Sequence, residues 1–457
     1  MSVRRSSTSR REFMARSARA AAGLAAGGTL AAKVSALPAP SAGAGIQGAN
    51  DRVVMAVIGI RSRGAQLMTG FAGLPGVHIK TIVDVDENLF ADTIARLEGI
   101  QDTPPGTAWD LRRMLEDRDI DAVAIATPNH WHALATIWSV EAGKHVYSEK
   151  PCCHNIFEGH RMVEAQARTG RVVAVGMQNR SLRNVRQAMA FLHSGGIGEV
   201  YMAKGLCFKP RDSIGRFPDS PVPEGVHYDL WLGPAPERPF NQNRFHYNWH
   251  WHWDYGCGDI GNQGPHQWDI ARWGLDIDEP PRFIHSAGGY FAFDSAQETP
   301  NTQTAVLEYA DGRILQFEVR GLYTGAEDGI RIGNLFFGTE GWLHLDGTNW
   351  QSYFGRENEP GPGSDTVEAA ADPMNLGGSG GGNHFANFIY AVRTGNQADL
   401  TCPVATGFRS DRLHHLANIS YRVGRKLEYD PIRERFVSDR EADALLTREY
   451  RRPYVVR

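Results

Sequence analysis

The residue best suited to proton transfer lies in the motif HVYSEKP at 145–151, where a short apolar run ends in Glu149, Lys150 and Pro151. An unprotonated lysine amine accepts a proton, and acid–base catalysis needs such a group within hydrogen-bond reach of the substrate. A lysine at the end of a strand is otherwise an ordinary solvated charge. Its place between a carboxylate and a proline favours the catalytic interpretation, and a cis peptide bond before Pro151 would help to aim it.

A second motif, GIRSRG at 59–64, follows the apolar run 53–58. Gly59 and Gly64 occupy the first and third positions of the G-x-G-x-x-G turn that holds a dinucleotide, but Arg61 replaces the second glycine. A side chain there adds a Cβ where the pyrophosphate approaches the backbone. Taken alone, the motif leaves two interpretations open: a cofactor loop, or an ordinary strand-to-helix turn.

Asp84 favours the cofactor loop. It ends the next apolar run, where a carboxylate accepts hydrogen bonds from ribose hydroxyls and disfavours a 2′-phosphate. The alternative is a solvated aspartate at a strand end. NAD is therefore the expected cofactor, and NADP stays open because Arg61 or Arg63 can pair with a phosphate.

The motif IATPNHWH at 125–132 is a third apolar run that opens into a polar loop. If the strands are parallel, all these loops leave the carboxyl edge of one sheet, where doubly wound folds bind ligands. Asn129 and His132 would then face the ribose or nicotinamide. The residues expected to contact the cofactor are Gly59, Ile60, Arg61, Arg63, Gly64, Asp84, Thr127, Pro128, Asn129, His132, Glu149 and Lys150.

The segment RFHYNWHWHWDYG at 244–256 is unusually rich in aromatic residues and histidines. Tryptophan and tyrosine faces stack on sugar rings, and histidines bind hydroxyl groups. The expected substrate contacts are Arg180, Tyr247, Trp249, His250, Trp251, His252 and Trp253. Two alternatives remain, a structural aromatic cluster and a metal site. Because the spacing of the metal-ligating types is irregular, we predict no metal; the residues considered are His246, His250, His252, Asp254 and His266.

The elements that must position these residues form two domains. Short apolar runs alternate with helical patterns, and they predict a doubly wound α/β domain over 51–176 with strands at 53–58, 79–83, 121–126, 144–148 and 171–175. Residues 302–320 alternate around Asp311-Gly312, which is typical of an antiparallel hairpin. We therefore predict that 177–457 is an α+β domain with a largely antiparallel, open-faced sheet and C-terminal helices.

Together with GNQGPHQWDIARW at 261–273, these motifs resemble the Gfo/Idh/MocA family, relatives of glucose–fructose oxidoreductase and inositol dehydrogenase. The resemblance implies that the first domain binds a nicotinamide cofactor and that the second presents the substrate to Lys150 and its partner His266. Relatives usually carry aspartate at the position of Asn262, one helical turn before His266. Asparagine orients a hydroxyl group but accepts no proton, so the resemblance assigns the acid–base work to Lys150 and to a His266 that titrates near neutrality.

The ends and the overall charge bear on location and partners. Residues 1–36 contain SRREFM at 9–14, an apolar stretch and a small-residue cleavage triplet, and they resemble a twin-arginine export signal, with 37–50 as a linker. The formal net charge of −4 gives no reason to expect a nucleic-acid or membrane partner. We expect a periplasmic or otherwise exported homo-oligomer whose ligand is a small carbohydrate.

Three functions fit these observations. The first is an NAD(P)-dependent oxidoreductase acting on a secondary hydroxyl of a sugar, polyol or glycoside, with a tightly bound cofactor. The second is a redox-neutral NAD-dependent glycosidase or lyase, which oxidises, eliminates and then reduces again. The third is a non-catalytic sugar-binding protein of the same fold. Export favours a cofactor that is never released.

Overall fold

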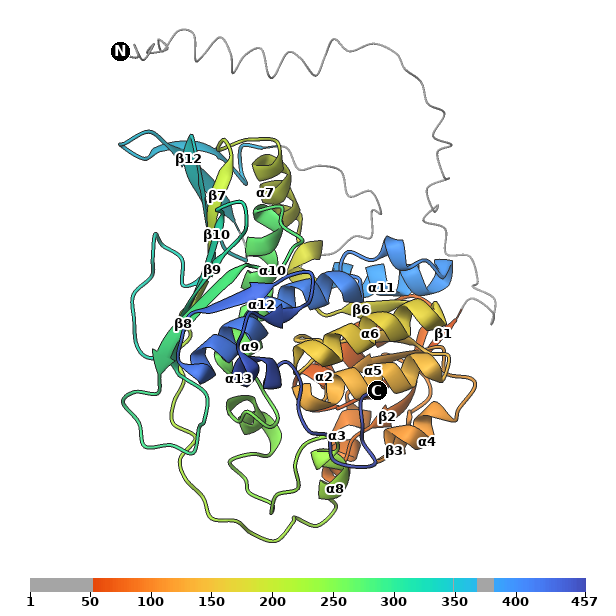
Figure 1. The fold of residues 1–457 in the computed structure, drawn as a ribbon. Helices are drawn as coiled ribbons and strands as arrows, with labels where there is room; N and C mark the ends of the chain where they lie inside the picture. Colours follow the sequence, from red (N-terminus) through yellow and green to blue (C-terminus); the bar gives the residue numbers. More distant parts are fainter. Residues whose placement is uncertain (1–51, 348, 368–381) are drawn as a thin grey trace, which may run out of the picture. The chain divides into compact units, whose positions relative to one another are not determined.

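The computed structural model describes residues 52–347, 349–367 and 382–457. The predicted signal at 1–36 and the linker at 37–50 lie outside these residues. Within the described part, residues from 52 onward belong to one compact unit, and it contains two sheets (Figure 1).

The first sheet confirms the predicted doubly wound fold. Its strands are all parallel and lie in the order β3-β2-β1-β4-β5-β6. From β1 the chain adds β2 and β3 on one side and β4, β5 and β6 on the other, so the strand order reverses between β1 and β4. Such a reversal opens a crevice at the carboxyl ends of the two strands, where ligands bind. The strands are β1 (Val53–Ile58), β2 (Val77–Val83), β3 (Gly106–Ala108), β4 (Ala122–Ile125), β5 (His145–Ser148) and β6 (Val173–Val175).

Helices cover both faces of this sheet, which explains why its strands are apolar throughout. Along β1, Met55 and Val57 pack on one side with α2, whereas Ala56 and Ile58 pack on the other with α5 and α6. The helices of this half are α2 (Arg63–Ala72), η2 (Glu87–Leu89), α3 (Phe90–Ala95), α4 (Leu111–Leu115), α5 (Asn129–Glu141) and α6 (Ile156–Thr169).

The second sheet confirms the predicted antiparallel domain. It has ten strands in the order β14-β13-β12-β11-β7-β10-β9-β8-β15-β16, and only β7 and β10 pair in parallel. Its strands are β7 (Val200–Cys207), β8 (Phe283–Gly289), β9 (Thr302–Glu308), β10 (Ile314–Arg320), β11 (Ile332–Gly338), β12 (Gly341–Leu345), β13 (Trp350–Phe354), β14 (Glu359–Gly363), β15 (Leu427–Asp430) and β16 (Arg435–Phe436).

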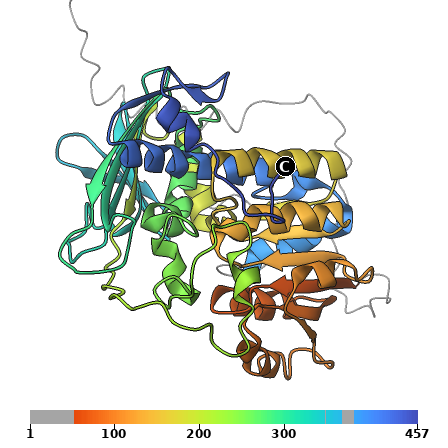
Figure 2. The same ribbon diagram turned by 60° about the horizontal axis from the view of Figure 1, so that its bottom comes forward.

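One face of the second sheet is buried by helices. Every second residue of β9 and β10 is buried, and Trp268 of α10 stacks on Phe317 with ring centroids 4.3 Å apart. Both α10 and α12 lie along this face (Figures 1 and 2). The helices of this half are α7 (Arg183–His193), α8 (Tyr228–Leu232), α9 (Gly258–Asn262), α10 (Gly264–Gly274), α11 (Gly382–Thr394), α12 (Val404–Val423) and α13 (Arg440–Ala444), with the 3-10 turns η3 (Gln178–Ser181), η4 (His246–Trp251) and η5 (Gln397–Asp399).

The C-terminal helices reach back to the first sheet. Phe385 of α11 packs against Phe71 of α2 with centroids 4.8 Å apart, and Phe388 lies against Tyr147 of β5 at 5.7 Å. Helix α12 contacts both α6 and β6. Although both helices belong in sequence to the predicted second domain, they complete the core of the first. None of the described helices is long and apolar enough to cross a bilayer.

Candidate active site

A cavity of about 560 Å³ opens at the carboxyl edge of the first sheet and is shared with the second half of the chain. Loops after β1, β2, β4 and β5 line one side, and η4, α9 and α10 line the other. The predicted residues that line it are Gly59, Arg61, Arg63, Asp84, Thr127, Pro128, Asn129, His132, Glu149, Lys150, Tyr247, Trp249, His250, Asn262 and His266.

The glycine loop has the close packing that a dinucleotide turn requires. Gly59 adopts a φ of +79°, and a Cβ there would lie 2.7 Å from the carbonyl oxygen of Ala126. A Cβ on Gly64 would lie 1.7 Å from the carbonyl oxygen of Gly59, so the end of β1 and the start of α2 approach each other only through glycine.

Arg61 is tolerated at the middle position because its φ is negative and its side chain is exposed. Helix α2 begins next to it, and the N-cap residue Ser62 makes no side-chain hydrogen bond to the first turn. The amide groups of that turn are thus free of a side-chain cap, and such groups bind phosphate well. Both features fit a pyrophosphate beside the loop.

Asp84 is held at the rim by two backbone amides. Its carboxylate accepts hydrogen bonds from the N–H of Ile60 at 2.9 Å and from the N–H of Asp86 at 3.0 Å. Burial raises the pKa of Asp84 to about 6 even though both bonds oppose the shift. Ile60 itself is buried and does not line the cavity, so it acts by orienting Asp84. Gly64 likewise lies behind the cavity wall.

Lys150 sits at the junction of the two halves. Its Nζ donates a 2.6 Å hydrogen bond to the carbonyl oxygen of Asn262 at the end of α9. The Lys150–Pro151 peptide is cis. Burial lowers the pKa of Lys150, and the nearby charge of Arg63 adds to the fall while Glu149 opposes it. A neutral amine in contact with one carbonyl keeps a lone pair free for a substrate proton.

The segment around Lys150 is fixed from several directions. Glu149 accepts a 2.6 Å hydrogen bond from Arg63 Nε, and its other oxygen lies 3.2 Å from the amide of Lys150. His132 bridges two loops, with ring nitrogens 2.6 Å from the Pro151 carbonyl oxygen and 2.7 Å from that of Thr127. Several residues expected to touch the cofactor therefore also position the lysine.

His266 and Asn262 both face the cavity, but not from one helix as predicted. Helix α9 ends at Asn262 and α10 begins at Gly264, with Pro265 in its first turn. The expectation that His266 titrates near neutrality is wrong. Burial, followed by the charge of Lys150, lowers its pKa well below the usual histidine range. His266 is thus a neutral hydrogen-bonding group at pH 7, and its Nδ1 has no partner among the described residues.

The aromatic segment divides between the cavity and the core. Tyr247, Trp249 and His250 line the cavity on η4, and the rings of Trp249 and His250 stack with centroids 3.6 Å apart. The Nδ1 of His250 lies 2.5 Å from the Tyr247 carbonyl oxygen, and burial lowers the pKa of His250 to about 3. This part of the segment can stack on a sugar ring and bond its hydroxyl groups.

Four residues predicted to contact substrate are placed elsewhere. Trp251 is buried beneath the guanidinium of Arg211 at 5.2 Å. His252 bonds the carbonyl oxygen of Asn243 through Nε2 at 2.8 Å. Trp253 lies against Arg422 at 5.2 Å. Trp251 is the last residue of η4 and the other two follow it, and all three side chains pack against the protein rather than into the cavity.

Arg180 is the fourth of these residues. It makes a buried bidentate ion pair with Asp269, at 2.7 and 2.9 Å, and stacks over Trp273. Arg180 belongs to η3 and does not line the cavity, so its contacts give it a structural role.

Sequence reasoning missed two cations in the cavity wall, Lys209 and Arg211, which follow β7. Arg211 forms a bidentate pair with Asp259, at 2.8 and 2.9 Å, and donates to the Tyr247 hydroxyl at 2.9 Å. The pair with Asp259 raises the pKa of Arg211 although burial opposes it. The available signal was their position just beyond an apolar strand, but no local pattern showed that this strand end meets the carboxyl edge of the other sheet.

Known proteins resemble this chain in sequence and in fold. The family model described as an oxidoreductase family with an NAD-binding Rossmann fold matches residues 53–177, and its companion C-terminal alpha/beta domain matches 212–313 and 380–456. A glycosyl hydrolase family 109 protein of Saccharopolyspora erythraea is 29% identical over 211 residues, 43% of this chain and 45% of the relative. The match therefore spans less than half of that curated relative.

Solved structures agree at the level of the fold. A levoglucosan dehydrogenase in complex with NADH and levoglucosan superposes with a TM-score of 0.63 at 19% identity, covering 82% of this chain and 99% of the other. An aldose-aldose oxidoreductase from Caulobacter crescentus, complexed with glycerol, gives 0.62 at 18%, covering 82% and 99%. Since the two family models together match most of the chain, the protein belongs to the Gfo/Idh/MocA family of NAD-dependent oxidoreductases.

Proposed function

We propose that the protein oxidises a secondary hydroxyl group of a sugar, polyol or glycoside and holds its NAD tightly. The observation that carries this proposal is the meeting of Lys150 and His266 in the cavity into which the glycine loop opens. The packing at Gly59 and Gly64 fits a pyrophosphate, and Asp84 fits the adenosine ribose. The nicotinamide ring supplies the acceptor for the hydride that leaves the carbinol carbon.

In this proposal the chain itself handles the proton. The unprotonated Lys150 amine takes the proton of the substrate hydroxyl as the carbonyl forms. His266 is neutral and lines the same cavity, where its ring hydrogen-bonds the same or the neighbouring hydroxyl. Tyr247, Trp249 and His250 bind the sugar ring from the opposite wall.

The direct test is a mass-spectrometric search for NAD or NADP released from the purified, denatured protein, followed by a screen of sugars and glycosides. We expect bound NAD, and an absorbance rise near about 340 nm, the band of reduced nicotinamide, when a substrate is added. Protein without cofactor that also fails to bind added NAD or NADP would refute the proposal.

A redox-neutral glycosidase or lyase is the second candidate. The glycosyl hydrolase name of the Saccharopolyspora relative favours it, and so does the export expected from residues 1–36. It predicts cleavage of an aryl glycoside with no net change near about 340 nm, whereas the simple oxidoreductase accumulates reduced cofactor. The third candidate is a non-catalytic sugar-binding protein. It predicts no turnover in the wild type and unchanged ligand binding in Lys150→Ala.

We also propose that the twin-arginine signal directs the protein to the periplasm. The support is the order of elements in 1–36, with Arg10 and Arg11 ahead of an apolar stretch. Fractionation of cells that express the full chain, with mass measurement of the mature N-terminus, tests this. Replacing both arginines with lysine should retain the protein in the cytoplasm, and continued export of that variant would contradict the proposal.

A further inference from the structure

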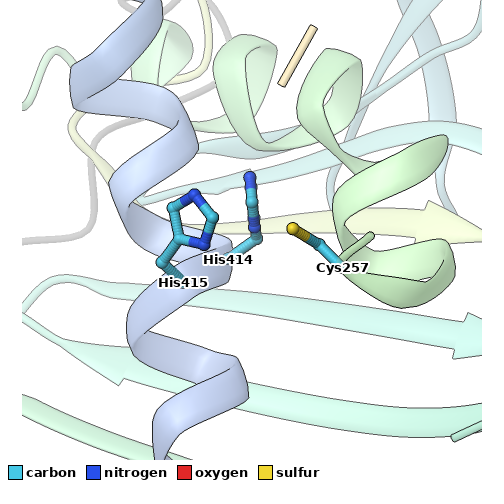
Figure 3. A group of neighbouring side chains, drawn as sticks. All are labelled: Cys257, His414 and His415. Atoms are coloured by element: carbon cyan, nitrogen blue, oxygen red, sulfur yellow. The ribbon is translucent and has the colours of Figure 1, made fainter. Parts of the chain in front are cut away.

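A cluster of metal-binding side chains lies outside the cavity. Cys257 immediately precedes α9, and His414 and His415 are consecutive on α12; all three are buried. One potential ligand atom from each lies within 4.8 Å of those of the other two. Figure 3 shows the Cys257 sulfur directed toward the His414 ring, with His415 on the other side. None of the three lines the cavity described above.

The hydrogen bonding of His414 is unsatisfied. Its side chain has no exposed surface, and neither ring nitrogen has a hydrogen-bond partner among the described residues. Leaving a buried polar group unpaired costs about 1–3 kcal/mol, so a buried imidazole with two unpaired nitrogens needs an explanation. A bound cation supplies one by accepting a nitrogen lone pair.

A fourth donor is within reach. Cys153 Sγ is buried and lies 3.7 Å from His415 Nε2, which is also 3.2 Å from the Cys153 carbonyl oxygen. In a tetrahedral zinc site, bonds of about 2.3 Å to sulfur and 2.0–2.1 Å to nitrogen separate the two ligand atoms by about 3.6 Å. The separation of Cys153 Sγ and His415 Nε2 matches this value, but Cys153 Sγ is not among the ligand atoms that all lie within 4.8 Å of one another, so it has to move to join the other three.

We propose that Cys153, Cys257, His414 and His415 bind a structural Zn²⁺ ion. Two thiolates and two imidazoles form one of the usual structural zinc sets, and metal binding releases one proton from each thiol. The resulting site is electrically neutral, as burial requires. Asp411 Oδ1 has no hydrogen-bond partner among the described residues and lies 3.6 Å from His414 Nε2, where it can orient that ring while the other nitrogen binds the metal.

Such an ion would join three segments behind the catalytic lysine. Cys153 follows Lys150 by three residues, Cys257 leads into the helix whose last carbonyl binds Lys150 Nζ, and both histidines belong to α12. The site would thus fasten the lysine turn without entering the reaction, which is a role separate from the proposed oxidation.

The test uses full-length protein without a polyhistidine tag, produced in zinc-supplemented medium and analysed by inductively coupled plasma mass spectrometry. We expect about one zinc per chain in the wild type. The Cys257→Ser and His414→Asn variants should each lose most of their bound zinc. Cys207→Ser is the matched control, because Cys207 is equally buried but belongs to β7, and it should keep its zinc. Zinc-free wild-type protein that takes up no added Zn²⁺ would overturn the proposal.

A second measurement on the wild type guards against variants that fail to fold. X-ray absorption spectroscopy should show sulfur scatterers near about 2.3 Å and nitrogen scatterers near about 2.0–2.1 Å around zinc. An oxygen-only shell, or zinc unchanged in Cys257→Ser, would place the metal elsewhere and refute the assignment. Bound NAD is measured on the same samples, so a missing zinc with NAD present would refute this site and leave the proposed function standing.

Discussion

Lys150 combines burial with a single carbonyl contact, and these two features set its protonation. Since burial lowers its pKa, the unprotonated base should appear at a pH below the ordinary lysine value of 10.5. We predict that kcat/KM for hydroxyl oxidation rises about tenfold per pH unit and levels off below that value. Steady-state rates from pH 6 to about 11 measure the profile. Lys426→Met, at an exposed lysine paired with Glu308, should not change it; a plateau only near the ordinary value would contradict the assignment.

We predict that the carboxylate of Asp84 makes cofactor affinity depend on pH. Its pKa is raised to about 6 by burial, so the group is protonated below that pH and charged above it. Ribose hydroxyls donate to the charged form, and NAD affinity should therefore increase as pH rises from 5 to 7 and then stay constant. Calorimetric titration of cofactor-free protein measures this. Asp84→Asn should bind weakly with no such dependence, and a wild type with pH-independent affinity would show that Asp84 does not contact the ribose.

The same carboxylate affects the stability of the cofactor-free protein with the opposite sign. A folded-state pKa raised above the unfolded value near 3.8 means that the folded protein holds this proton more tightly. The contribution of Asp84 to stability is therefore full at low pH and is lost as pH rises from about 4 to about 6. We expect bound cofactor to offset this loss, because its ribose hydroxyls would hydrogen-bond the charged carboxylate.

The turn between β1 and α2 depends on glycine at two of its three motif positions. Gly64→Ala would place a methyl group against the backbone of Gly59, and we predict a loss of about 1–3 kcal/mol in unfolding free energy, with weaker NAD binding. Arg61→Gly should keep NAD binding, because the φ of Arg61 is not positive and glycine can adopt the same backbone conformation. Urea denaturation and calorimetry measure both effects. Gly106→Ala, whose nearest neighbour would be 3.7 Å away, is the control; equal stability of Gly64→Ala and this control would contradict the account.

Helix α12 holds the turn after Lys150, the proposed base, through Asp411. This buried carboxylate accepts a 2.6 Å hydrogen bond from the amide of Cys152, two residues after Lys150. Asp411→Ala leaves that amide unpaired, and we predict a fall in kcat of at least tenfold with little change in KM. Asp411→Asn keeps an acceptor and should recover most of the rate. If both variants lose activity equally, or if only KM changes, Asp411 does not act by holding the turn.

Local sequence patterns predict some of these elements, and contacts between distant segments decide the rest. The sequence predicted strands β1 and β4 and the hairpin at Asp311-Gly312 because their patterns are local. The meeting of the loops at one sheet edge was also predictable, since the carboxyl ends of parallel strands lie at the same edge. The sequence did not predict which side chains pack away from the cavity, because this depends on contacts between segments far apart in the chain; these residues are Arg180, Trp251, His252 and Trp253. The protonation of His266 was missed for the same reason, because its burial is created by both halves together.

The proposed catalytic residues come together only where the two halves of the chain meet. The first half contributes the cofactor loop and Lys150, and the second contributes His266 and the carbonyl that holds the lysine amine. The C-terminal helices pack on both halves and so fix the position of one half against the other. Neither half has the complete site by itself.

The central claim is that Lys150 takes a proton from a substrate hydroxyl beside a bound nicotinamide. Rapid mixing of NAD-loaded protein with a substrate found in the screen, followed near about 340 nm over one turnover, tests it most directly. The wild type should reduce its cofactor, whereas Lys150→Met, with the same NAD content, should do so at least a hundredfold more slowly. Cofactor reduction in Lys150→Met at the wild-type rate would contradict the account.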